Sequence, residues 1–329
     1  MSTAALEAST GAARSLDLRH RPRRAERIAE GVIVAVALLS IVAVALILVF
    51  VGKEALPVLF SEVVHEEVSP VSMILPREVN GHAMYLWQPV SDVPKYNIVP
   101  LFLGSLKVTV VALLFAVPMS VAAAVYCAEY APRRVREVLK PAIELMAGVP
   151  SVVAGFFALV VLATWVQSAF GTEHRLNAIV AGLGLAFATC PVIFSVSEDA
   201  LRSVPQSYRT AALALGSTPT QAILRVILPA AIPGIGAGVM LGFGRAIGET
   251  LIVVLASGNA ALMDSTLGHS TRTVTATIAQ ELGEVVVGSA HYHVLFALGA
   301  LLFLVTFAVN VVTERALHRS RQSLTGSKR

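Results

Sequence analysis

Long apolar runs constrain this chain more than any other feature of its sequence. Each run is about 20 residues long, which at 1.5 Å per helical residue matches the roughly 30 Å hydrocarbon core of a bilayer. The first run is longer than the apolar part of a signal peptide, so we expect it to be retained. The runs predict an all-α membrane protein with six transmembrane helices, at Gly31–Val51, Leu101–Ala128, Ala142–Trp165, Asn177–Val196, Pro233–Leu255 and His293–Val312.

Composition supports the membrane assignment and argues against nucleic acid as a partner. Only 14% of the 329 residues are charged, whereas about a quarter is usual in soluble domains. The formal net charge is +4, but the lysines and arginines gather in short segments between apolar runs and do not form one basic face. The cysteines, Cys127 and Cys190, lie in apolar runs without a spacing motif, so we expect neither a disulfide nor a metal site from them.

The polar segments divide the chain and predict its orientation. The segment 53–100 is acidic and rich in proline, and we expect an extended periplasmic loop with at most short elements. Basic residues concentrate in the tails and in the 129–140 and 197–231 loops, so the positive-inside rule places both termini in the cytoplasm. The predicted parts are a basic tail (1–27), a first transmembrane helix (28–52), the periplasmic loop (53–100), a core of five helices (101–312) and a second basic tail (313–329).

An arginine and a glutamate interrupt the fifth apolar run. Arg245 and Glu249 are four residues apart, which would place them on one face of a continuous helix. A charged side chain near the bilayer centre costs about 2.5 to 3.5 kcal/mol on insertion scales, so it normally faces the protein interior or a water-filled path. The pair is therefore either a functional site or an ion pair that holds two helices together.

Signatures of nucleotide binding and of hydrolysis are absent from the sequence. Gly52 and Lys53 form a Gly-Lys pair, but the other residues of the phosphate-binding P-loop motif are absent around it. Any ATP and Mg²⁺ would therefore be bound by another chain. There is no nucleophile elbow and no paired-histidine zinc motif, and His291 and His293 are more typical of a membrane interface than of a metal site. We expect no catalytic residue, no metal and no cofactor bound by this chain.

The segment 197–231 is amphipathic and is expected to form two short surface helices, with breaks at Pro205, Gly216 and Pro229. Within it, YRTAALALGSTPTQAILRVILP resembles the coupling motif of ABC importer permeases, which is Glu-Ala-Ala, three residues, Gly, nine residues, Ile, one residue, Leu-Pro. Thr210 stands where the motif has glutamate and Val226 where it has isoleucine. The resemblance implies that the segment docks on an ATPase through Thr210, Ala211, Ala212, Leu213 and Gly216.

Four further stretches narrow the resemblance to the permeases of phosphate-specific (Pst) ABC transporters. They are GFGRAIGET followed by GN, ELMAGVPSVVAGFF, SLKVTVVALLFAVPMSVAAAVYCAEYAP and HVLFALGALLFLVTFAVNVV, and together the similarity covers about Trp87 to Val312. The long outer loop with Trp87 and the first span set well ahead of it look more like the C-type subunit than the A-type subunit. The resemblance implies a type I importer permease fold. The implied partners are a paralogous A-type permease, a dimer of ATP-binding subunits and a periplasmic phosphate-binding protein.

The same resemblance implies that Arg245 and Glu249 lie on the substrate path. The planar guanidinium of arginine matches phosphate oxygens, and a glutamate can hold that arginine or accept a hydrogen bond from protonated phosphate. Thr250, Asn259 and Glu144 are further candidates, Glu144 being placed just inside the third span. The outer charges Asp264, Arg272, Glu281 and Glu284 are expected to be solvated.

Two other functions remain open from the sequence. The chain could be the permease of an ABC importer for another oxyanion or small solute. It could also be a transporter or channel that works without an ATPase, in which case the coupling segment would have no use.

Overall fold

The computed structural model describes residues 24–79 and 82–325, and it divides the chain into two units, Met1–Phe50 and Val51–Arg329. The described part of the first unit belongs to helix α2 (Arg24–Ala55), which is apolar from Ile28 onward. Most of the predicted basic tail, residues 1–23, lies outside the described residues. Six helices in the described part are long and apolar enough to cross a membrane, as the sequence predicted.

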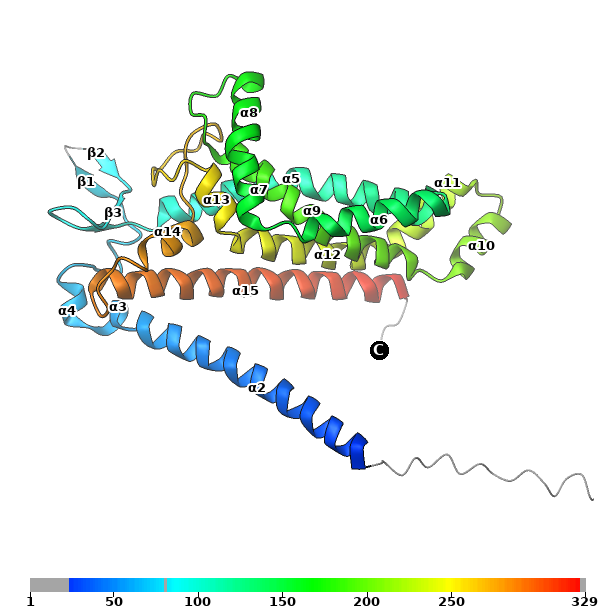
Figure 1. The fold of residues 1–329 in the computed structure, drawn as a ribbon, viewed down its shortest axis with the longest axis horizontal. Helices are drawn as coiled ribbons and strands as arrows, with labels where there is room; N and C mark the ends of the chain where they lie inside the picture. The colour runs from blue at the N-terminus through cyan, green and yellow to red at the C-terminus, as the bar shows by residue number, and fades with distance from the viewer. Residues whose placement is uncertain (1–23, 80–81, 326–329) are drawn as a thin grey trace, which may run out of the picture. The chain divides into compact units, whose positions relative to one another are not determined.

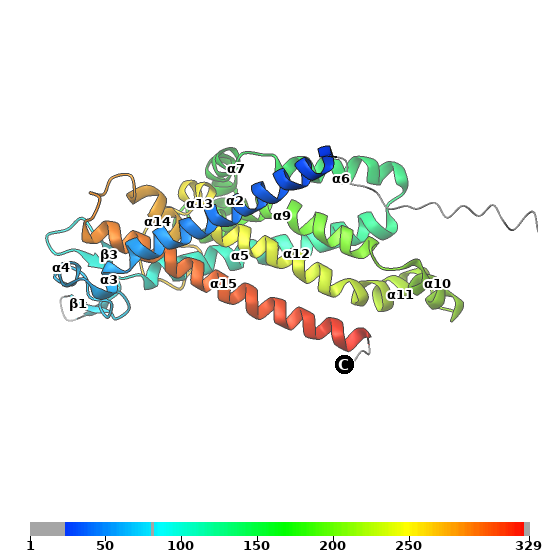
Figure 2. The same ribbon diagram turned by 90° about the horizontal axis from the view of Figure 1, so that it is seen from below.

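Four long helices pack together in the second unit (Figures 1 and 2): α5 (Val99–Val125), α9 (Ala178–Arg202), α12 (Leu228–Gly248) and α15 (Ala290–Thr325). Small residues let α9 approach its neighbours closely. A Cβ atom on Gly182 of α9 would lie 2.4 Å from Val111 Cγ1 of α5, and one on Gly242 of α12 would lie 2.5 Å from Ile193 Cγ1 of α9. Membrane helices associate largely through such close contacts, because lipid tails are as apolar as the side chains.

The third span starts later than predicted. The run from Ala142 to Trp165 is divided between α6 (Arg133–Ala147), α7 (Ser151–Phe157), a π-helical turn η2 (Ala158–Leu162) and α8 (Ala163–Phe170). The break falls before Pro150, because proline has no N–H and its ring keeps the preceding residue out of the helical region. The membrane-length helix is therefore Ser151–Phe170, and α6 is an amphipathic helix with no buried residue.

The segment between α9 and α12 also differs from prediction. The first expected surface helix is α10 (Gln206–Ala214), but the second is continuous with the fifth span through α11 (Pro219–Ala222) and the π turn η3 (Ile223–Ile227). A π turn lies where the ring of Pro229 would meet the carbonyl of Arg225 in a regular helix, so this proline does not end the span. Helices α10 and α11 lie at one end of the four-helix group, which we call the α10 end (Figures 1 and 2).

Short elements pack at the opposite end, as predicted for residues 53–100. They are α3 (Pro57–Phe60), α4 (Glu62–His65), the antiparallel pair β1 (Arg77–Val79) and β2 (His82–Met84), and the antiparallel pair β3 (Trp87–Gln88) and β4 (Lys95–Tyr96). This segment has a hydrophobic core shared with α14 (Val274–Glu281) and the start of α15. Burial, with Glu67 and Glu281 nearby, raises the pKa of Tyr96 to about 12.

Candidate functional site

Arg245 lies in the last turn of α12 with an exposed side chain. Gly238 and Gly242 of the same helix pack against α9, whereas Leu241 and Gly248 are exposed together with Arg245. The carbonyl end of a helix favours a cation, so this position suits an arginine. Within the described part of the chain, the guanidinium has no hydrogen bond or ion pair. Its donors are available to a ligand or to another subunit.

Glu249 does not share a helical face with Arg245, so this prediction is wrong. Helix α12 ends at Gly248, and Glu249 has an extended backbone with φ −71° and ψ 135° before α13 (Leu251–Ala256) begins. Glycine lacks a side chain and is a weak helix former, which helps the helix to end here. The side chain of Glu249 accepts a hydrogen bond from the backbone N–H of Thr250 at 3.2 Å, and its carbonyl accepts one from Thr275 Oγ1 of α14 at 3.0 Å.

Thr250 and Asn259 flank the short helix α13. The hydroxyl of Thr250 donates to the carbonyl of Gly248 at 3.4 Å, which places it at the break between α12 and α13. Asn259 has a positive φ of 57°, and its amide nitrogen donates to the carbonyl of Val254 at 2.7 Å. Asn259 therefore satisfies a backbone carbonyl near the end of α13. This is a structural role, whereas the sequence suggested a role for Asn259 on the substrate path.

Glu144 lies outside the third span, contrary to prediction. It is exposed on α6 and its carboxylate is 3.9 Å from Lys140 Nζ. The cause is the break before Pro150, which leaves Glu144 on the amphipathic helix. Glu144 and Arg245 thus belong to different kinds of element, one in a surface helix and the other in a candidate span.

The predicted coupling residues gather on α10 and the turn after it. Ala212 is buried, whereas Thr210, Ala211, Leu213 and Gly216 are exposed. The turn has the hydrogen bonds of a glycine-terminated helix: the N–H of Gly216 donates to Leu213 and that of Ser217 to Ala212, with Gly216 at φ +83°. Arg209 of α10 forms an ion pair with Glu129, which follows α5 and has a side chain 3% exposed. The helix is thereby tied to the bundle while its outer face stays open.

Besides Glu129, two further buried ionisable groups inside the candidate spans were missed by the sequence reasoning. Glu198 of α9 is fully buried and accepts hydrogen bonds from Lys140 Nζ at 2.7 Å and Arg202 Nη1 at 3.3 Å. The hydrogen bond that Lys140 donates to Glu198 raises the pKa of Lys140, which lies on α6 outside the candidate spans. Lys107 of α5 is also buried, and its Nζ donates to the carbonyl of Thr266 at 3.2 Å. A charge inside an apolar run was the available signal for Lys107, whereas Glu198 lies just past the predicted end of the fourth span.

Three of the four outer charges, Asp264, Arg272 and Glu281, are partly buried rather than solvated, whereas Glu284 is exposed as expected. Arg272 Nη2 is 3.0 Å from Glu281 Oε1, and the two side chains are 16% and 14% exposed. Glu281 also accepts from Trp87 Nε1 at 3.1 Å and lies 2.9 Å from His291 Nε2. This cluster holds the segment 53–100 against α14 and α15. His291, which the sequence analysis did not favour as a metal ligand, is part of this cluster.

The chain matches the family model of the binding-protein-dependent transport system inner membrane component over residues 116–322. It is similar to the probable ABC transporter permease protein YqgH of Bacillus subtilis, with 34% identity over 84% of this chain and 85% of that protein. It is also similar to the phosphate transport system permease protein PstC of Mesorhizobium japonicum, with 33% identity over 71% of this chain and 76% of that protein.

Solved structures agree on the fold. A bacterial alginate ABC transporter in complex with its pentasaccharide-bound periplasmic protein matches with a TM-score of 0.58 and 15% identity, over 90% of this chain and 98% of that chain. The MetNI methionine ABC transporter matches with a TM-score of 0.53 and 16% identity, over 66% of this chain and 93% of that chain. The chain therefore belongs to the family of binding-protein-dependent transport system inner membrane components, as the multi-pass permease subunit of an ABC importer whose ATPase is a separate subunit.

Proposed function

We propose that this chain is the C-type permease subunit of a phosphate importer, and that Arg245 contacts phosphate on the translocation path. The observation that carries the proposal is the exposed guanidinium at the end of α12, inside a candidate span, which has no partner among residues 24–79 and 82–325. Lipid is an unfavourable neighbour for this charge, so a second subunit or a water-filled path must cover it. Relatives named as phosphate transport system permeases support the choice of substrate.

The chemistry of arginine fits a phosphate anion. The planar guanidinium donates in a fork that matches two phosphate oxygens, and hydrogen bonds between charged partners are among the stronger ones in proteins. Glu249 Oε1 accepts from the N–H of Thr250, which leaves the other carboxylate oxygen to accept from protonated phosphate. Fully ionised sulfate has no such proton, so this carboxylate favours phosphate over sulfate. Thr250 lies beside the same helix break and can add a hydroxyl.

The exposed surfaces support the following assembly. A paralogous A-type permease covers the face of α12 that carries Arg245, and a dimer of ATP-binding subunits, which hold ATP and Mg²⁺, docks on α10. In this arrangement the α10 end and both termini are cytoplasmic in the inner membrane of a bacterium. The opposite end, which carries the segment 53–100, receives a periplasmic phosphate-binding protein.

Uptake of radiolabelled phosphate by the assembled transporter tests this proposal. Arg245→Gln removes the charge from the path, and we expect uptake to fall at least about tenfold, because hydrogen bonds to charged groups contribute about 1.5 to 3 kcal/mol. Arg133→Gln is the matched control, because Arg133 is an arginine on the exposed surface of α6, with a side chain 91% exposed. Normal uptake by Arg245→Gln at equal membrane level would refute the role of Arg245.

A second candidate is an importer of another oxyanion or small solute, because structures with this fold come from transporters of alginate and methionine. ATP hydrolysis by the reconstituted complex separates the two functions. Stimulation by phosphate and its binding protein, but not by sulfate, is expected of the phosphate importer. Stimulation by sulfate alone would identify the other oxyanion.

A further inference from the structure

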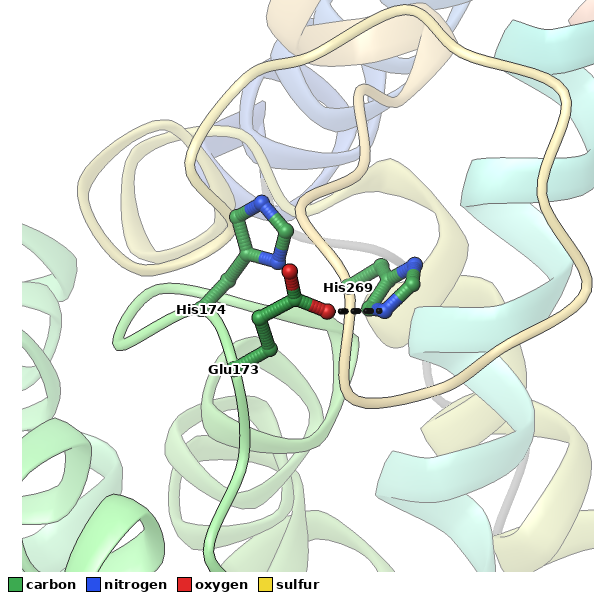
Figure 3. Close-up of side chains that lie close together, drawn as sticks. All are labelled: Glu173, His174 and His269. Carbon is green, nitrogen blue, oxygen red and sulfur yellow. Dashed lines mark ion pairs between the residues drawn. The ribbon is translucent and has the colours of Figure 1, made fainter.

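Two loops that are distant in sequence bring together two histidines and a glutamate. Glu173 and His174 lie in the loop between α8 and α9, and His269 lies in the loop between α13 and α14. Their ligand atoms are all within 4.8 Å of one another. Figure 3 shows the two imidazole rings on either side of the carboxylate of Glu173. All three residues lie outside the candidate membrane spans, where metal ions in water can reach them.

The spacing of this group fits a divalent metal ion. Zinc binds imidazole nitrogen and carboxylate oxygen at about 2.0 to 2.2 Å, so two ligand atoms of a tetrahedral site are roughly 3.4 Å apart. His269 Nε2 is 3.4 Å from Glu173 Oε2, which already matches this separation. The carboxylate of Glu173 is 77% exposed and His174 is exposed, so both side chains can rotate to close the remaining distance.

A neighbouring carboxylate orients His269 for this role. Asp264 interacts with Nδ1 of His269, and its other oxygen accepts from the backbone N–H of Thr266 at 2.8 Å. A carboxylate accepts the proton of Nδ1, so the lone pair of the neutral ring is on Nε2, the atom that faces Glu173. Histidines that bind metals commonly donate their other ring N–H in this way, which fixes the tautomer and the direction of the ring.

Backbone contacts hold the two loops together beneath the side chains. The N–H of Ala178 donates to the carbonyl of His269 at 3.3 Å, which joins the start of α9 to the second loop. The buried side chain of Asn177 donates to the carbonyl of His174 at 2.8 Å. On the other side, the N–H of Thr271 donates to the carbonyl of Ser257 at 3.0 Å. The backbone under the cluster is therefore fixed before any ligand binds.

We propose that Glu173, His174 and His269 bind one zinc ion, with water as the remaining ligand, and that the ion clamps the two loops together. Two imidazoles, a carboxylate and water form a ligand set that zinc uses in proteins, whereas calcium and magnesium prefer oxygen ligands alone. The second loop lies between α13, which follows the break at Glu249, and α14, so the clamp restrains the chain on the outer side of that break. This site is separate from the proposed phosphate path and does not depend on the transported substrate.

Zinc titration of the full-length chain, purified in detergent with no polyhistidine tag, tests the site by calorimetry. We expect saturable binding of about one equivalent of Zn²⁺, removed by a chelator. His174→Ala and His269→Ala should abolish it, while His318→Ala, a change of the same type near the end of α15, should leave it unchanged. A d–d absorption band of added Co²⁺ with the intensity of a tetrahedral complex reports the same ligands independently.

Asp264→Asn provides a variant that keeps all three ligands. Loss of a residue that orients a ligand typically weakens metal binding about 10- to 100-fold, and that range is expected here. If a histidine variant does not yield folded protein, Glu173→Gln, at an exposed position, together with Asp264→Asn decides the question. Absence of saturable zinc binding, or binding that persists in the ligand variants, would overturn the proposal.

Discussion

Glu198 shows how one buried charge depends on residues from another helix. Its carboxylate is fully buried in α9, and its partners are Lys140 of α6 and Arg202 of α9. A buried carboxylate without partners is strongly unfavourable, because the low dielectric around it replaces water. Lys140 also lies 3.4 Å from Asp199, so a single ammonium group links α6 to the end of α9. The link holds an amphipathic helix that has no buried residue of its own.

Lys140→Met is therefore expected to destabilise the protein by about 1.5 to 3 kcal/mol, the range for hydrogen bonds to charged groups. Arg202 remains as a partner of Glu198, so the loss of stability is smaller than it would be for a buried carboxylate with no partner. The measurement is the thermal unfolding midpoint in detergent. Adding Glu198→Gln to Lys140→Met should recover part of the loss, because the glutamine carries no charge. Equal midpoints for wild type and both variants would show that this network does not stabilise the fold.

At the residue scale, the sequence located single charges better than it located their partners. Arg245 was identified because a cation in an apolar run is conspicuous, but its exposure, and its lack of a partner in the part of the chain that the structure describes, came from the structure. The pairing of Lys140 with Glu198, and of His174 with His269, joins residues far apart in the sequence, and no spacing rule reaches across such distances. Glu198 and Arg202 are four residues apart, and that spacing could have indicated part of the network.

At the scale of elements, the six spans were predictable and their ends were not. Apolar length sets the number of spans, because each must cross the same thickness of hydrocarbon. Proline has a different effect in each context. Pro150 lies at the start of a new helix, whereas Pro229 follows a π turn and the helix continues through it. The end of α12 at Gly248 was also hidden, because glycine occurs often in membrane helices without ending them. Local sequence does not distinguish these outcomes, which depend on tertiary packing.

The turn after α10 offers a test of coupling at this scale. Gly216 has φ +83°, and a Cβ atom there would meet nothing within 4 Å, so any effect of substitution acts through the backbone. Asparagine tolerates this conformation, whereas a β-branched residue does not. We expect Gly216→Val to lower phosphate uptake while ATP hydrolysis by the complex continues, and Gly216→Asn to have a much smaller effect. Equal uptake by both variants would mean that the shape of this turn does not matter for coupling.

At the scale of the whole molecule, exposed surfaces indicate where other subunits belong. The face of α10 and the following turn expose Tyr208, Leu213 and Leu215, at 50%, 42% and 88%. These residues lie outside the candidate spans, so an apolar group there is expected to be covered by protein. The exposed Arg245 on α12 requires a different cover, since it lies inside a span. The proposed assembly assigns a different partner to each of these two surfaces.

Co-purification from native membranes tests this division of surfaces. We expect an ATPase and a second permease to be recovered with the chain in mild detergent. Leu215→Arg should weaken recovery of the ATPase about 10- to 100-fold, because burial of a leucine contributes about 1.5 to 3 kcal/mol, and should leave the second permease in place. Val90→Arg, at a position 93% exposed in the segment between β3 and β4, is the matched control. Transport by the purified chain alone, with no ATPase recovered from any preparation, would contradict the proposed assembly and favour a self-contained transporter.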